Sequence, residues 1–198
     1  FFSKKYICHA FFVLSKLLEK ENLKKWISSY YLSKKRKKNV LVICAGNIPL
    51  VCFHDILCVL ITGNNLILKP SHKDSVLTYF VINKLIEIQP KFSKRIVISN
   101  FNKKLSYDMV ISTGSDSARK YFNYYFKKKP SIIRSNRTSI AILNGRENKK
   151  DLSSLASDVF LYFGLGCRNV TKLYIPKGYD IKQLEPYFYY YINNSSNK

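Results

Sequence analysis

The chain has 198 residues, of which 46% are hydrophobic and 15% aromatic, and its formal net charge at pH 7 is +22. This hydrophobic content is sufficient for one sizeable core and excludes an intrinsically disordered chain. The five cysteines include no CxxC pair and the longest apolar stretch, residues 48–62, is too short for a bilayer span, so we predict no metal site, no membrane span and a reducing, cytoplasmic location.

The N-terminal part, residues 1–38, is predicted to be a partial helical segment followed by a basic linker. Residues 7–31 carry their apolar side chains broadly on one side, as an amphipathic helix does. The basic run at residues 34–38 then separates this helix from the next apolar segment, which favours a solvated linker. The alternative is a basic nucleic-acid-binding domain, with this run as the contact. We expect no nucleic-acid partner, because the positive residues are otherwise scattered.

Residues 39–163 alternate short apolar runs with segments of helical periodicity, and we interpret them as one α/β domain. The alternation and the short connections favour a doubly wound parallel sheet, a fold that binds ligands beyond the carboxyl ends of its strands. The predicted strands lie near residues 39–44, 66–68, 95–99, 109–112, 132–133 and 139–143, and the predicted helices lie near 50–61, 76–88, 118–125 and from 151 to about 163.

Three of these predicted strands end in small, polar or turn-forming residues. The segments are Gly46-Asn47, Lys69-Pro70-Ser71 and Thr113-Gly114-Ser115. Because parallel strands share one carboxyl edge, these residues are candidates for a ligand site at that edge.

Residues 164–198 are expected to begin a catalytic domain that carries a nucleophilic cysteine. Cys167 follows Gly164 and Gly166, and we predict that a helix starts there, whose N-terminal dipole would stabilise a thiolate. The alternative is that Cys167 is a buried small hydrophobe. We give that interpretation to the other cysteines, which are Cys8, Cys44, Cys52 and Cys58.

The order of these motifs along the chain resembles the aldehyde dehydrogenase superfamily. More closely, residues 46–57 and 162–173 are similar to the acyl-CoA reductases related to the fatty-acid reductase subunit of bacterial luminescence systems. The resemblance runs from about residue 20 to about residue 180. It implies a Rossmann-like sheet of the aldehyde dehydrogenase type, and we expect the chain to be a fragment that is incomplete at both ends.

The resemblance also implies roles for single residues. Cys167 would be the nucleophile and Asn47 the side-chain donor to the oxyanion. Four residues would bind the cofactor, NADPH or NADH: Lys69 at the adenosine ribose with Ser71 nearby, and Gly114 with Ser115 at the pyrophosphate. His54 also fits the acyl-CoA reductase pattern, although we interpret it as structural.

Two departures from the hydrolytic enzymes bear on the reaction. The stretch that corresponds to their catalytic glutamate is Arg134–Thr138, which has no carboxylate, and Leu165 stands where a glutamine is common. A reductase needs no deacylating water, so we expect reduction of an acyl-CoA or acyl-protein thioester to an aldehyde. The alternative is a truncated, inactive relic of that enzyme. Acyl-chain length and assembly into a homo-oligomer are left open.

Overall fold

The structure is a computed structural model that describes residues 2–32, 37–99 and 106–195. Its contacts divide the chain into two compact units, Phe1–Ser135 and Asn136–Lys198. This division falls before the boundary expected at residue 163, because the helix at Lys149–Phe160 packs with the elements that follow it. Residues 34–36, the first part of the basic run, lie outside the described residues.

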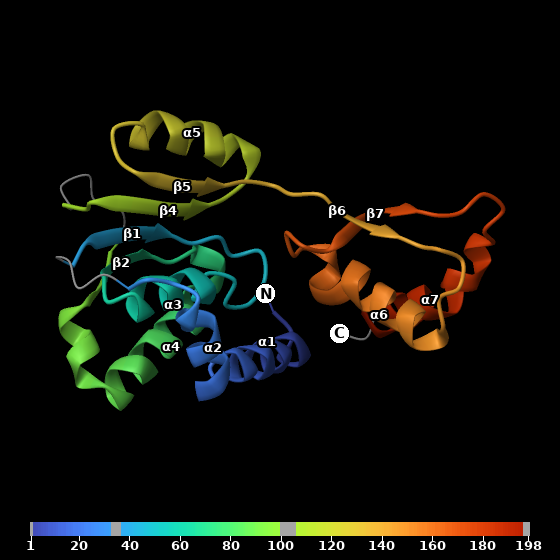
Figure 1. The fold of residues 1–198 in the computed structure, drawn as a ribbon, viewed down its shortest axis with the longest axis horizontal. Coiled ribbons are helices and arrows are strands. Elements are labelled where there is room, and N and C mark those ends of the chain that lie inside the picture. Colours follow the sequence, from blue (N-terminus) through green and yellow to red (C-terminus); the bar gives the residue numbers. More distant parts are fainter. Residues whose placement is uncertain (1, 33–36, 100–105, 196–198) are drawn as a thin grey trace. The chain divides into compact units, whose positions relative to one another are not determined.

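The first unit is built on a parallel sheet of five strands, in the order β3-β2-β1-β4-β5 (Figure 1). All four strand pairs are parallel, and the central strands are continuous apolar runs, as strands covered on both faces require. This arrangement confirms the predicted α/β class. The strands are β1 (Asn39–Ile43), β2 (Asn65–Lys69), β3 (Ile96–Ile98), β4 (Met109–Thr113) and β5 (Ser131–Arg134).

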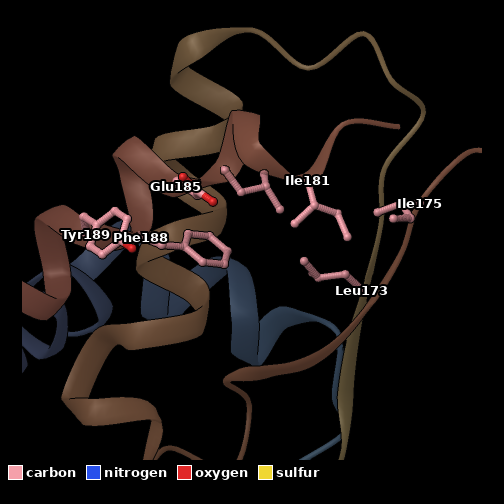
Figure 2. A pocket seen from close by; sticks show the side chains of 7 residues that line it. Leu173, Ile175, Ile181, Glu185, Phe188 and Tyr189 are labelled. Atoms are coloured by element: carbon pink, nitrogen blue, oxygen red, sulfur yellow. The ribbon is translucent and has the colours of Figure 1, made fainter. Parts of the chain in front are cut away.

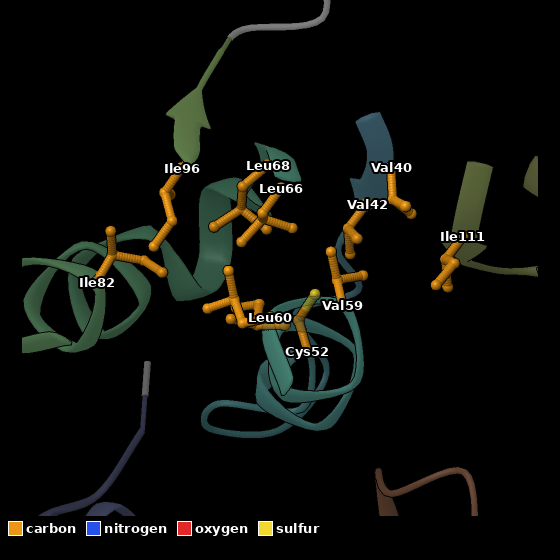
Figure 3. Close-up of a cluster of buried hydrophobic side chains, with 11 residues drawn as sticks. Val40, Val42, Cys52, Val59, Leu60, Leu66, Leu68, Ile82, Ile96 and Ile111 are labelled. Atoms are coloured by element: carbon orange, nitrogen blue, oxygen red, sulfur yellow. The ribbon is translucent and has the colours of Figure 1, made fainter. Parts of the chain in front are cut away.

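Helices cover both faces of this sheet, each over its own hydrophobic cluster. α3 (Phe53–Ile61) and α4 (Ser75–Ile88) lie on one face and α5 (Asp116–Phe126) on the other (Figure 1). Alternate residues of β1 serve the two clusters, since Val40 and Val42 face α3 while Leu41 and Ile43 face the α5 side. The larger cluster also contains Cys52, Ile56, Val59, Leu60, Leu66, Leu68, Ile82, Ile96 and Ile111 (Figure 3).

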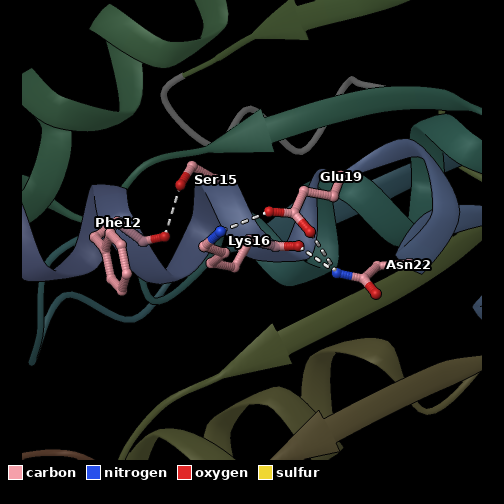
Figure 4. Close-up of polar contacts among 5 residues, drawn as sticks. All are labelled: Phe12, Ser15, Lys16, Glu19 and Asn22. Atoms are coloured by element: carbon pink, nitrogen blue, oxygen red, sulfur yellow. Dashed lines mark hydrogen bonds and ion pairs between the residues drawn. The ribbon is translucent and has the colours of Figure 1, made fainter.

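The N-terminal segment forms two helices, α1 (Lys4–Leu17) and α2 (Lys20–Ser28), where the sequence predicts one. The Asn22 amide donates to the Lys16 carbonyl at 2.7 Å, and Lys16 pairs with Glu19 at 2.8 Å (Figure 4). Ser15 donates its hydroxyl to the Phe12 carbonyl in the same turn. The Asn22 amide thus bonds a carbonyl in the last turn of α1, which a continuous helix would bond internally.

The second unit packs two helices on a parallel pair of strands. β6 (Ser139–Ile142) pairs with β7 (Val170–Tyr174), and α6 (Lys149–Phe160) and α7 (Glu185–Ser195) contact each other. α6 starts two residues before the predicted Asp151, because the Asn148 side chain caps it and Asp151 returns the bond. The hydrophobic core of the second unit contains Leu143, Leu152, Leu155 and Leu184. Short 3-10 turns lie at His72–Asp74, Pro90–Lys94, Leu161–Gly164 and Ile181–Leu184.

Candidate active site

The predicted cofactor residues and Asn47 all lie at or just after the ends of strands whose carboxyl ends are in register. Ile43 of β1 is level with Lys69 of β2 and with Ser112 of β4, and Thr113 is level with Arg134 of β5. From β1 the sheet continues outward to β2 and β3, and from β4 it continues in the opposite direction to β5. The carboxyl ends of β1 and β4 therefore flank the topological switch point, which is the usual ligand position in this architecture.

Two of the predicted loops touch each other at Gly46 and Ser71. A Cβ added to Gly46 would collide with the Ser71 hydroxyl and would lie 2.7 Å from the Ser71 Cβ. Gly46 is buried, and turning the Ser71 hydroxyl away would not relieve the collision, because the Ser71 Cβ is fixed by the backbone and is also too close. The loop that carries Asn47 and the loop that follows Lys69 therefore pack directly together.

We expect Gly46→Ala to lower the free energy of unfolding by about 1–3 kcal/mol, as inserting a methyl group into a filled space does. Removing the opposing side chain with Ser71→Gly should recover a large part of this loss in the Gly46→Ala background. Urea unfolding of the two single variants and the double variant measures both effects. Additive losses in the double variant would show that the two loops are not in contact.

The Asn47 loop is tied at both of its ends. Cys44, just after β1, and Cys52, just before α3, form a disulfide with Cα atoms 5.3 Å apart. This corrects the expectation that both are free thiols in apolar runs, because the loop folds back and brings them together. Leu50 has a φ of 54°, a left-handed conformation that is uncommon for residues other than glycine.

Asp74 connects this loop to the chain after β2. Its carboxylate accepts the Leu50 backbone N–H at 2.9 Å, and only 2% of the residue is exposed. Burial raises the pKa of Asp74 to about 6, while the hydrogen bonds from Leu50 and the Thr78 side chain act to lower it. The sequence interpretation did not single out Asp74, because an aspartate before a helix is an ordinary helix-capping residue.

The predicted pyrophosphate residues lie at the start of α5. The Ser115 hydroxyl accepts the Ala118 N–H at 3.2 Å and so caps the helix. A Cβ on Gly114 would lie 2.8 Å from the Ala118 Cβ, so glycine allows this turn to pack closely. The N–H groups of a helix N-terminus suit a phosphate, although the Asp116 carboxylate in the same turn offsets part of the positive dipole.

Arg134, at the end of β5, makes an ion pair across the carboxyl edge of the sheet. Its Nη1 lies 2.7 Å from both carboxylate oxygens of Asp55, in the first turn of α3. The side chains of Asp55 and Arg134 are 10% and 31% exposed, so the pair is largely shielded from water. The ion pair therefore joins the β5 edge of the site to the helix that follows the Asn47 loop.

Cys167 lies in the second unit, in a turn that leads into β7. The prediction that it begins a helix is wrong: the chain turns because Tyr162, Phe163 and Gly164 take φ values of 56°, 58° and 69°. Cys167 is exposed and free, which leaves its thiol accessible. A helix dipole therefore does not act on Cys167 in the way the sequence predicted.

Asn169 holds the turn around Cys167. Its side-chain oxygen accepts the Gly166 N–H at 2.7 Å, and its amide donates to backbone carbonyls at the end of α6, the nearest being that of Asp158 at 2.8 Å. Asn169, two residues after the nucleophile candidate, thus ties the turn to residues that precede Cys167. Asparagine often bonds local backbone in turns, but the sequence interpretation read this one as part of a helix.

The remaining free cysteines differ from the expectation that they are all buried. Cys8 is exposed and Cys58 is partly buried. The Cys58 sulfur lies 3.6 Å from Nδ1 of His54, one helical turn away. Burial first, and then the Asp55 charge, raises the pKa of Cys58, which disfavours its thiolate. His54 also packs against Trp26, a structural contact.

An apolar cavity of about 370 Å³ lies in the second unit between β7 and α7 (Figure 2). None of the predicted site residues lines it. Its lining residues are Leu173, Ile175, Ile181, Leu184, Glu185, Phe188 and Tyr189. Within the described ranges, no group of three or more His, Cys, Asp and Glu side chains could hold a metal ion, and every helix there is too short or too polar to traverse a bilayer.

A family model described as acyl-CoA reductase (LuxC) matches residues 11–185. No curated protein sequence matches the chain. Among solved structures, the aldehyde dehydrogenase KauB from Pseudomonas aeruginosa is similar with a TM-score of 0.64 and 18% identity, over 86% of this chain and 40% of that enzyme.

Two further aldehyde dehydrogenases are similar. Gamma-glutamyl-gamma-aminobutyraldehyde dehydrogenase from Burkholderia cenocepacia has a TM-score of 0.63 and 15% identity, over 82% of this chain and 38% of that enzyme. The Mycobacterium tuberculosis enzyme complexed with NAD+ has a TM-score of 0.60 and 20% identity, over 78% of this chain and 34% of that enzyme. This chain therefore spans less than half the length of these enzymes, and the likeness shows their fold.

Proposed function

The chain belongs to the acyl-CoA reductase (LuxC) family, and from this we propose that it is part of an enzyme that reduces a fatty acyl thioester to an aldehyde with NADPH or NADH. The observation that carries the proposal is the shared carboxyl edge of the aligned strands, where Lys69 ends β2 and where Asn47 and Ser115 lie just after β1 and β4. Cys167 is the proposed nucleophile, as the family resemblance implies.

In the first step the Cys167 thiolate attacks the carbonyl carbon of an acyl-CoA or acyl-protein thioester. Asn47 donates its side-chain amide to the oxyanion that develops. The carbonyl then re-forms, the bond to the substrate sulfur breaks, and that thiol leaves with a proton. The acyl group remains on Cys167 as a thioester.

The residues at the sheet edge fit a nicotinamide dinucleotide. Lys69 has an ammonium group at a half-buried strand end, suited to a ribose hydroxyl, and Gly114 with Ser115 places the start of α5 beside the switch point. When bound, the reduced cofactor would supply the hydride that converts the acyl-cysteine to aldehyde and regenerates the Cys167 thiolate.

The surroundings of Arg134 support reduction over hydrolysis. Residues 134–138 contain no carboxylate to activate water. The nearby Asp55 carboxylate is held by Arg134 at 2.7 Å, so it is engaged in an ion pair. The acyl-cysteine would therefore persist until hydride is available.

The proposal is tested by incubating the intact native protein with acyl-CoA and no reduced cofactor. We expect an acyl-protein to accumulate, and aldehyde to appear when NADPH or NADH is added. Asn47→Ala should slow acylation by a factor on the order of 100, the usual effect of removing one oxyanion donor. Mass spectrometry of timed samples measures the acylation rate.

The matched control is Asn65→Ala. Asn65 is also a half-buried asparagine, but it lies at the amino-terminal end of β2, where its amide bonds the Asn39 side chain at 3.0 Å. Its replacement should leave the acylation rate unchanged. Wild-type acylation by a folded Asn47→Ala variant would refute the role of Asn47.

A further inference from the structure

The loop between β1 and α3 needs an external anchor to hold Asn47 in place. Leu50, three residues after Asn47, has a φ of 54°, and a left-handed conformation is unfavourable for a residue with a side chain. Leu50 is also buried, at 5% exposure. Such a backbone persists only where the surrounding structure fixes it.

The Asp74 side chain provides that anchor, and it does not cap the helix that follows it. Asp74 occupies the N-cap position of α4, yet it makes no side-chain capping bond to that helix. Its Oδ2 instead accepts the Leu50 N–H at 2.9 Å, across 24 residues of sequence. Its Oδ1 is buried and has no hydrogen-bond partner among the described residues. A buried carboxylate with an unsatisfied oxygen is costly, which points to a function for Asp74 in this long-range contact.

Thr78 and Gly46 complete the arrangement. The Thr78 side chain, 2% exposed and one helical turn after Asp74, acts to lower the pKa of the Asp74 carboxyl. On the other side of the loop, the Cα of Gly46 packs against Ser71 and Lys73. The segment from Ser71 to Asp74 thus holds the Asn47 loop at Gly46 and at Leu50, one residue before Asn47 and three after it.

We propose that Asp74 is a positioning residue that fixes the Asn47 amide in place for the acylation of Cys167, through its hydrogen bond to the Leu50 backbone. The proposal rests on the proposed oxyanion role of Asn47. It also makes the loop after the Lys69 strand a common support for the cofactor side and the acylation side of the site.

The test is a double-mutant cycle on the intact native protein. Asp74→Ala should slow acylation of Cys167 by acyl-CoA by a factor on the order of 10 to 100, because a displacement of about 1 Å has effects of this size. In the Asn47→Ala background the same change should have little further effect, because Asp74 acts through Asn47. Acylation is followed by mass spectrometry, and circular dichroism verifies the fold of each variant.

Two further variants separate positioning from general stability. Asp74→Asn keeps an acceptor oxygen for the Leu50 N–H and should recover most of the acylation rate that Asp74→Ala loses. Thr78→Val is nearly isosteric and should slow acylation by a smaller factor, again only when Asn47 is present. It serves as the decisive variant if Asp74→Ala does not fold.

The outcomes distinguish this inference from the function on which it rests. If Asn47→Ala acylates at the wild-type rate, the proposed role of Asn47 fails. If Asn47→Ala is slow but the Asp74 and Thr78 changes have no effect, or have the same effect without Asn47, the positioning role of Asp74 is overturned and the role of Asn47 stands.

Discussion

Replacing Cys167 with serine is expected to lower aldehyde formation from acyl-CoA by a factor on the order of 10⁴ or more, the scale seen when an enzyme loses its nucleophile. The thiol is exposed in the turn before β7, so substrate can reach it. No acyl group should remain on the protein when Cys167→Ser is incubated with acyl-CoA alone. Aldehyde formation and peptide mapping by mass spectrometry measure the two effects.

Cys8 is the matched control, because it is also a free and exposed cysteine. It lies on α1, which precedes the first strand of the sheet. Cys8→Ser should retain both acylation and aldehyde formation. An acyl group mapped to Cys8 instead of Cys167 would contradict the mechanism, and a general thiol reagent such as iodoacetamide should label both residues in the native protein.

Breaking the Asp55–Arg134 ion pair is expected to have the largest effect on stability. Asp55→Leu should lower the free energy of unfolding by roughly 3 kcal/mol, because the Arg134 guanidinium is left without its partner in a largely shielded position. We place the loss at the low end of the range for buried pairs because the Arg134 side chain is 31% exposed. Urea denaturation measures the change.

A double variant and a surface pair make this prediction specific. Asp55→Leu combined with Arg134→Met should be more stable than Asp55→Leu alone, because no unpaired charge remains. Lys84 and Glu87 are also 2.7 Å apart, but their side chains are 52% and 66% exposed. Glu87→Gln should therefore change stability by about 0.5 kcal/mol or less. An equal loss for both pairs would contradict the argument.

The sheet and the edge that carries the candidate site residues could be predicted because their signals are local. Short apolar runs such as residues 39–44 and 66–68 are typical of buried parallel strands, and the turn residues after them mark where each strand ends. Lys69 and Asn47 meet at one edge because all the strands run in parallel, which the alternation of strands and helices already indicated. The family resemblance is confirmed over residues 11–185.

The features that escaped prediction depend on contacts between distant residues or on unusual backbone. Asp74 bonds Leu50 across 24 residues, and no periodic pattern encodes such a pair. The glycines before Cys167 suggested a helix start, whereas the left-handed Tyr162 and Phe163 and the Asn169 side chain make a turn. The two N-terminal helices were predicted as one because the sequence does not show that the Asn22 side chain bonds the Lys16 carbonyl.

The Cys44–Cys52 disulfide has a consequence for the conformational entropy of the site. It closes a ring with a sequence separation of 8 around Asn47, and a ring of this size removes roughly 2–3 kcal/mol of chain entropy from the unfolded state in the loop-closure model. The restriction is already present in the free protein. The Asn47 loop is therefore preorganised, and its ordering need not be driven by the binding of an acyl thioester.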